Sequence, residues 1–117
     1  MDFKITDYPN SILKIKFEKG ESIISEKGSF ILSDGRFSAE NKLEFSSYKN
    51  LIAKIGGKSL SYVCYTAKEN LEMNLGTRDN TELTLIKINN NNPMVIRANA
   101  HFARTSDLEL KLINKSI

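Results

Sequence analysis

Apolar residues alternate with polar or charged ones along several short stretches, and this period of two restricts the fold more than any other feature. In Leu13–Glu18 every apolar residue is followed by a lysine or a glutamate. Successive side chains of a β-strand point to opposite faces of a sheet, so the pattern predicts a strand with one face buried and one in water. The same rhythm predicts strands over 71–75, 83–88 and 108–112.

The stretch 60–65 has apolar or aromatic side chains on both of its faces. Tyr62 and Cys64 fall on one face, and Val63 and Tyr65 fall on the other. A strand that is apolar on both faces is typical of the middle of a sheet. We therefore predict that this strand is central.

Glycines mark the connections between the predicted strands. Asp34-Gly35 separates Phe30–Leu32 from Phe37–Ala39, and Asp-Gly favours the positive φ angles of a type I′ turn. A β-hairpin is therefore predicted at this point. Gly20 is expected to allow the turn from the first of these strands into Ser22–Ile24.

One segment has the spacing of a helix. Tyr48, Leu51, Ile52 and Ile55 recur at i, i+3, i+4 and i+7, which is one face of a helix. The spacing predicts a short helix over residues 47–55. The same stretch also alternates, so a strand is the alternative.

About ten short strands with tight turns and almost no helix indicate an all-β sandwich or barrel. No linker or shift in composition divides the chain, so a single domain over residues 1–117 is expected.

Charge and cysteine content restrict the partners and the compartment. The formal net charge is +3 and the lysines are scattered, whereas nucleic-acid binders cluster them on one face. No stretch approaches the roughly 18 apolar residues that span a bilayer. Met1–Ile5 lacks the apolar core of a secretory signal. With Cys64 as the only cysteine, these features predict a cytoplasmic protein without a transmembrane segment.

Candidate catalytic and metal-binding groups are few. A single histidine and a single cysteine do not make a zinc site, and no cofactor is predicted. Gly57-Lys58-Ser59 ends like a phosphate-binding loop, but Ile52 stands where that motif needs its first glycine. An enzyme that uses Glu21 or Glu26 together with His101 stays open as an alternative.

The order of several motifs resembles a known family. The motifs are Gly20–Ile24, Glu26–Phe30, Gly57–Leu60 and Asn99–Ala103. This order resembles the mitochondrial-biogenesis family named for altered inheritance of mitochondria, over most of the chain. Three places depart from the family pattern, and one of them is the Gly57-Lys58-Ser59 turn, which lacks the usual acid. In the other two, Phe30 stands where methionine is usual, and Ala103 directly follows Phe102 without the usual leucine.

The resemblance implies a β-sandwich of the double-stranded β-helix type, similar to the tryptophan RNA-binding attenuation protein and often oligomeric. It implies no catalytic residue and no cofactor. Within the first two motifs, a structural turn role is expected for Gly20, Glu21, Ser22, Gly28 and Ser29. We therefore predict a non-catalytic homo-oligomer that acts as a structural or interaction module. An RNA-binding or small-ligand-binding module is the alternative.

Overall fold

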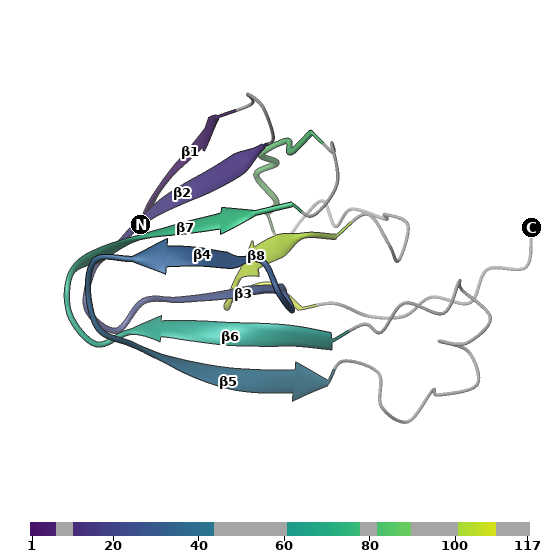
Figure 1. Cartoon of the computed structure of the whole chain (residues 1–117). Coiled ribbons are helices and arrows are strands. Elements are labelled where there is room, and N and C mark those ends of the chain that lie inside the picture. The colour runs from purple at the N-terminus through teal and green to yellow at the C-terminus, as the bar shows by residue number, and fades with distance from the viewer. Residues whose placement is uncertain (7–10, 44–60, 78–81, 90–100, 110–117) are drawn as a thin grey trace, which may run out of the picture.

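The computed structural model of the chain describes residues 1–6, 11–43, 61–77, 82–89 and 101–109 (Figure 1). Within these ranges the chain forms eight strands and no helix. The strands are β1 Asp2–Thr6, β2 Ile12–Phe17, β3 Ser22–Glu26, β4 Phe30–Ser33, β5 Phe37–Leu43, β6 Ser61–Ala67, β7 Leu71–Gly76 and β8 Ala103–Thr105. The helix predicted over 47–55 lies outside the described residues.

The strands form two four-stranded sheets that face each other, so the predicted all-β sandwich is confirmed (Figure 1). The first sheet has the order β1-β2-β7-β4, and the second has the order β5-β6-β3-β8. Every neighbouring pair is antiparallel.

The core lies between the two sheets and is built from the alternating apolar residues. Ile15, Met73 and Leu75 have no exposed surface, and they point inward from β2 and β7 of the first sheet. Ile23 and Tyr65 are cross-strand partners that meet them from the second sheet. The strands predicted at 13–18 and 71–75 are therefore confirmed, together with the face that each one buries.

β6 lies between β5 and β3, so the prediction of a central strand at this position is confirmed. Val63 and Tyr65 point into the core. Tyr62, on the outer face of the second sheet, is also buried. Cross-strand neighbours of a middle strand cover both of its faces, which explains its doubly apolar sequence.

The hairpin predicted at Asp34-Gly35 is wrong. β4 pairs with β7 in the first sheet and β5 pairs with β6 in the second, so the turn carries the chain from one sheet to the other. Residues 18–21 and 68–70 make the same change of sheet, and these three crossing turns gather at one end of the sandwich (Figure 1). A short turn between two strands does not require that they pair, because packing against the core selects their partners.

The strand predicted over 83–88 is also wrong, because residues 82–88 form no strand. The Leu83 backbone N–H donates to Ser11 Oγ at 3.1 Å, and Leu83 packs against the core. Leu85, Ile86 and Ile88 are exposed. Alternation gives a segment two faces, but a strand also needs a hydrogen-bonded neighbour. Of the strand predicted over 108–112, residues 108 and 109 are not in a strand, and the rest lies outside the described residues.

Candidate functional site

The predicted turn motif begins at Gly20, in the first crossing turn. Gly20 has a φ of 91°, a left-handed conformation that favours glycine. Its backbone N–H donates to the Ala67 carbonyl at 2.8 Å, and the Ala67 N–H donates to the Glu21 carbonyl at 3.0 Å. Beyond the turn, the hydroxyls of Ser22 and Thr66 lie 2.7 Å apart, between β3 and β6. These bonds attach the turn to the end of β6.

The carboxylate of Glu21 binds groups of the chain itself. The Glu18 backbone N–H donates to Glu21 Oε1 at 2.7 Å, and the amino group of Met1 donates to Oε2 at 3.2 Å. The Glu18 N–H, followed by the N-terminal ammonium, lowers the pKa of Glu21 below its ordinary value. A carboxylate held ionised in this way is suited to fixing a turn and poorly suited to taking up a proton at neutral pH.

The second part of the motif, Gly28-Ser29, leads the chain from β3 into β4. Gly28 has a φ of 87°. The buried hydroxyls of Ser29 and Ser25 lie 2.7 Å apart, and the Gly76 N–H donates to the Ser29 carbonyl at 2.8 Å. These contacts set the point at which β4 joins β7.

Two other acidic side chains at the crossing turns, Glu69 and Asp34, also accept hydrogen bonds from backbone N–H groups. The Arg36 N–H donates to Glu69 Oε2 at 2.7 Å, and this bond is the main cause of the lowered pKa of Glu69. Likewise the Glu72 N–H donates to Asp34 Oδ1 at 2.7 Å. Among the described residues, no group of three or more His, Cys, Asp or Glu side chains could hold a metal ion.

The structure places Glu21 far from His101 but places Glu26 in the same part of the sandwich as His101. Glu26 is the cross-strand partner of Tyr62, and the rings of Tyr62 and His101 lie 5.0 Å apart in an edge-to-face contact. Arg104 lies over the same tyrosine ring, with 5.6 Å between its guanidinium carbon and the ring centroid. Glu21 precedes the opposite end of β3, about 16 Å from Glu26 at the usual rise of a strand.

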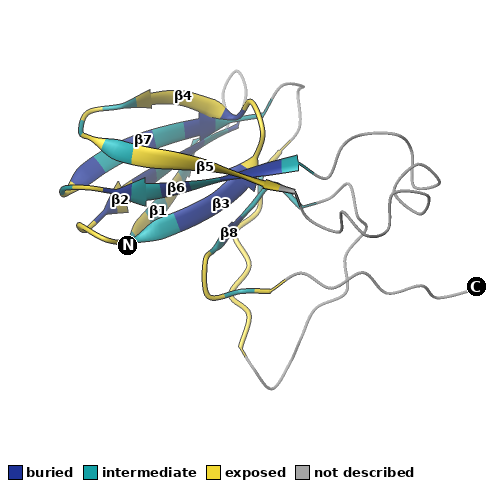
Figure 2. Ribbon diagram, turned by 90° about the horizontal axis from the view of Figure 1, so that it is seen from below, coloured by how far each residue is buried: buried dark blue, intermediate teal, exposed yellow. Residues whose placement is uncertain are grey.

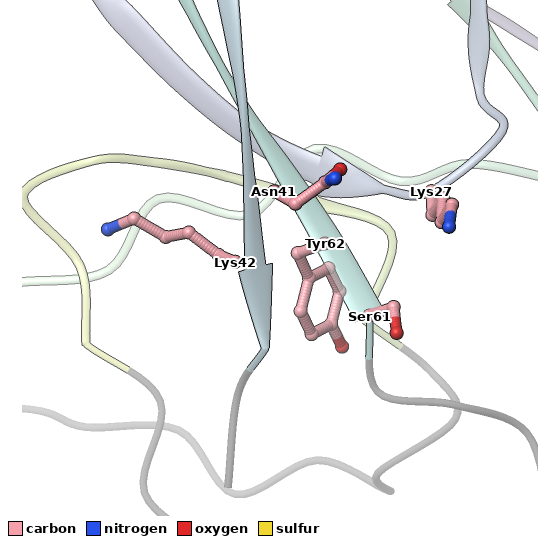
Figure 3. Close-up of a pocket in the computed structure, with 5 residues that line it drawn as sticks. All are labelled: Lys27, Asn41, Lys42, Ser61 and Tyr62. Carbon is pink, nitrogen blue, oxygen red and sulfur yellow. The ribbon is translucent and has the colours of Figure 1, made fainter. Parts of the chain in front are cut away.

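A shallow hollow of about 140 Å³ lies beside Tyr62. Its lining residues are Lys27, Asn41, Lys42, Ser61 and Tyr62 (Figure 3). Lys42 extends away from Tyr62 and Ser61, on the opposite side of β5 from Asn41 and Lys27 (Figure 3). Neither Glu26 nor His101 lines the hollow. The space is below the roughly 300 Å³ of a typical ligand pocket.

A different feature is the exposed apolar edge formed by β4. Phe30, Ile31 and Leu32 are 39%, 48% and 49% exposed, and β4 is the last strand of the first sheet. Most of this strand is coloured as exposed in Figure 2. We call these three residues the β4 edge. Sequence reasoning missed this surface because it assigned β4 to a hairpin, in which β5 would have covered that edge.

A β-bulge directs two side chains of the β4 edge to the same face. Phe30 pairs with Leu75 and Leu32 pairs with Asn74, so Ile31 is the extra residue. Asn74 lies between two buried neighbours on β7 and therefore points outward, as does its partner Leu32. Ile31 also lies on the outer face, because a Cβ added at Gly76 would meet its Cδ1 at 2.7 Å.

Aromatic contacts hold β4 against the second sheet. The ring centroid of Phe30 lies 5.2 Å from that of Phe37 and 6.0 Å from that of Tyr65. Phe37 and Tyr65 are themselves 5.7 Å apart in an edge-to-face arrangement. Such ring pairs add about 0.5–1.5 kcal/mol each beyond the burial of their area. The exposed β4 edge therefore belongs to a strand that is packed against the second sheet.

Comparison with models of protein families shows which family the chain belongs to. The model of the family described as mitochondrial biogenesis AIM24 matches residues 3–116, which is nearly the whole chain. The chain belongs to this family. The resemblance inferred from its motifs is thus confirmed.

No curated protein and no solved structure matches the chain of this AIM24 family member. Among its described residues, no helix is long and apolar enough to cross a membrane.

Proposed function

We propose that this AIM24 family member is a non-catalytic β-sandwich that associates with itself and serves as a structural or interaction module. The observation that carries the proposal is the β4 edge, where three large apolar side chains are 39–49% exposed on an edge strand. An exposed apolar edge strand is a template for pairing with another chain, and monomeric proteins usually protect such edges.

The other described edge strands carry charged side chains, which β4 lacks. β1 contains Asp2 and Lys4, and β5 contains Glu40 and Lys42. β8 has only three residues. Charged side chains, short length and β-bulges all limit edge pairing, and β4 has the last two, with four residues and one bulge. β4 contains no charged residue, so among these edges it is the one suited to an interface.

The use of the acidic groups supports a non-catalytic role. Glu21, Glu69 and Asp34 accept hydrogen bonds from backbone N–H groups at the crossing turns. Acids that cap turns in this way hold the fold together and are not directed at a common reacting atom. We also propose a cytoplasmic location, which fits a chain with the single cysteine Cys64.

Size-exclusion chromatography with light scattering over a dilution series tests the self-association. We expect a mass above that of the monomer at high concentration and a return toward the monomer on dilution. A monomer at every concentration would contradict the proposal. Raising the salt concentration should leave the association unchanged or strengthen it, because β4 contains no charge and apolar contacts resist screening.

The hollow beside Tyr62 supports the second candidate function, the binding of RNA or a small anion. Lys27 and Lys42 both contribute to its lining, with the Lys42 side chain extending to the other side of β5, and lysines supply phosphate contacts that weaken as salt rises. Filter binding of single-stranded RNA at low and high salt tests this candidate. We expect Lys27→Gln and Lys42→Gln to weaken binding, whereas Lys87→Gln, an exposed lysine outside the hollow, serves as the matched control. Absence of retention at low salt would eliminate RNA binding.

A further inference from the structure

We propose that β4 pairs antiparallel with β4 of a second copy of the chain, about a two-fold axis. The pairing would join the two four-stranded first sheets edge to edge into one continuous sheet. This inference rests on the proposed self-association and specifies its surface, its partner and its symmetry.

The composition of β4 favours a second copy as the partner. Its sequence, Phe-Ile-Leu-Ser, has no charged residue, so two copies meet without like-charge repulsion. A two-fold interface uses the same patch on both subunits, which must therefore be self-complementary. Asp34 follows β4 and Lys27 precedes it. The antiparallel direction places the end of one strand beside the start of the other, which separates like charges better than a parallel direction does.

A second copy could also cover Ile31 and Leu32 by stacking face to face on the first sheet. The charges on the outer face of that sheet disfavour this arrangement. Lys4 and Lys14 are direct cross-strand partners, and Lys14 points outward because its neighbours Leu13 and Ile15 are buried. Stacking two such faces would bring the lysine pairs of both copies close together. Like charges in direct opposition are destabilising, more so as water is excluded.

Edge-to-edge pairing keeps these lysines apart. Lys14 lies on β2, which is separated from β4 by β7. At the usual strand spacing of about 4.8 Å, the two β2 strands would lie about 24 Å apart across the axis. This separation exceeds the Debye length of about 8 Å at physiological ionic strength. Edge pairing therefore covers the apolar side chains without placing the lysine pairs against each other.

The bulge sets the strength of the pairing. Because Ile31 and Leu32 both point outward, each would gain the corresponding side chains of the partner as neighbours on one continuous face. A four-residue strand with a bulge offers only a short ladder of hydrogen bonds. The dimer is therefore expected to dissociate on dilution in a measurable range.

Lysine substitutions on β4 test the surface directly. We expect Leu32→Lys to weaken the dimer at least tenfold in sedimentation or light scattering, because the two added charges would lie close together across a four-residue strand pair. Ile31→Lys is the second variant and should act in the same way. Leu85→Lys is the matched control, since Leu85 is 53% exposed but lies outside β4. Circular dichroism should give all three variants the β-sheet spectrum of the wild type.

Cysteine cross-linking tests the direction of pairing and does not depend on the lysine variants folding. In a Cys64→Ser background, single cysteines are placed at each position of 30–33 and oxidised. An antiparallel pair has one position nearest its axis, so a disulfide-linked dimer should form best there and fall off on both sides. A parallel pair would bring each position beside its own copy. Leu85→Cys should give no dimer.

The outcomes separate the inference from the proposal on which it rests. A wild-type protein that is monomeric throughout removes both. An oligomer that persists in Leu32→Lys and Ile31→Lys, with no cross-linking at 30–33, leaves self-association standing and overturns pairing through β4. Cross-linking at every position of 30–33 would overturn the antiparallel direction, and dissociation by Leu85→Lys alone would place the interface at residues 82–88.

Discussion

Gly20 and Gly35 lie in two crossing turns, and they should respond differently to substitution because the structure needs each glycine for a different reason. Gly35 is not left-handed, but a Cβ added there would meet Leu71 Cβ at 2.7 Å and Glu69 Cγ at 3.3 Å. Gly20 has a φ of 91° and open space around an added Cβ. Lack of space therefore restricts which residues can replace Gly35, whereas the left-handed backbone conformation restricts which residues can replace Gly20.

The close contact at Gly35 sets the size of the first effect. Carbon atoms in contact normally lie about 3.5–4.0 Å apart. Leu71 Cβ is attached to the backbone, so no change of rotamer moves it, and the turn or β7 must shift. Overpacking of this kind costs about 1–3 kcal/mol, partly offset by about 0.4–1 kcal/mol from the stiffer unfolded chain. We expect Gly35→Ala to reduce the free energy of unfolding by about 1–2 kcal/mol, or about 4–8 °C in Tm.

At Gly20 the cost comes from strain in the backbone. Alanine in a left-handed conformation is less stable by about 1–2 kcal/mol, whereas asparagine adopts that conformation more readily. Gly20→Asn should therefore be more stable than Gly20→Ala. At Gly35 the order should be reversed, because the larger asparagine deepens the contact with Leu71.

Urea unfolding at a concentration where each variant is monomeric measures both pairs. The slope of free energy against urea should be unchanged, so that the midpoints report stability. The reasoning is refuted if Gly35→Ala is as stable as the wild type. It is also refuted if asparagine is better tolerated than alanine at position 35.

Two further predictions concern the core and the first crossing turn. Met73 has no exposed surface, so Met73→Ala should lower the unfolding free energy by about 2–5 kcal/mol, measured by urea unfolding. Met73→Leu should cost less than about 1.5 kcal/mol, and an equal loss in both variants would contradict the packing argument. The pKa of Glu21 is lowered in the folded state, so its contribution is present above the unfolded value and is lost as pH falls through the folded value. Glu21→Gln should therefore be less stable than wild type at neutral pH and lose less stability on acidification. Urea midpoints measured between neutral and acidic pH test this. If the midpoints of the two proteins fall in parallel with pH, the stabilising role of ionised Glu21 is contradicted.

Much of the strand content could be predicted from the sequence because the face on which a side chain lies is a local property of the pleat. Alternation located Leu13–Phe17 and Leu71–Leu75 and identified their buried sides correctly. The doubly apolar sequence of β6 likewise predicted its central position. The short end strands β1 and β8 were missed, since β8 has only three residues and the pairing of β1 with β2 is decided in three dimensions.

Partner choice is the part that only the tertiary structure decided. Asp34-Gly35 has the composition of a hairpin turn, yet β4 and β5 belong to different sheets because β4 pairs with β7. Residues 83–88 alternate in two short runs, Leu83–Leu85 and Ile86–Ile88, but form no strand. Hydrogen-bonded neighbours come from distant parts of the chain, and a local pattern carries no information about them.

The β4 edge likewise depends partly on local residue properties and partly on which strands become neighbours. The sequence by itself determined that Phe30–Leu32 is apolar and extended, because side-chain chemistry and β-propensity belong to the residues themselves. Only the tertiary structure put this strand at the end of its sheet and inserted the bulge that turns Ile31 and Leu32 outward. Exposure depends on which strands are neighbours, and for β4 the fold provides a neighbour on one side alone among the described strands.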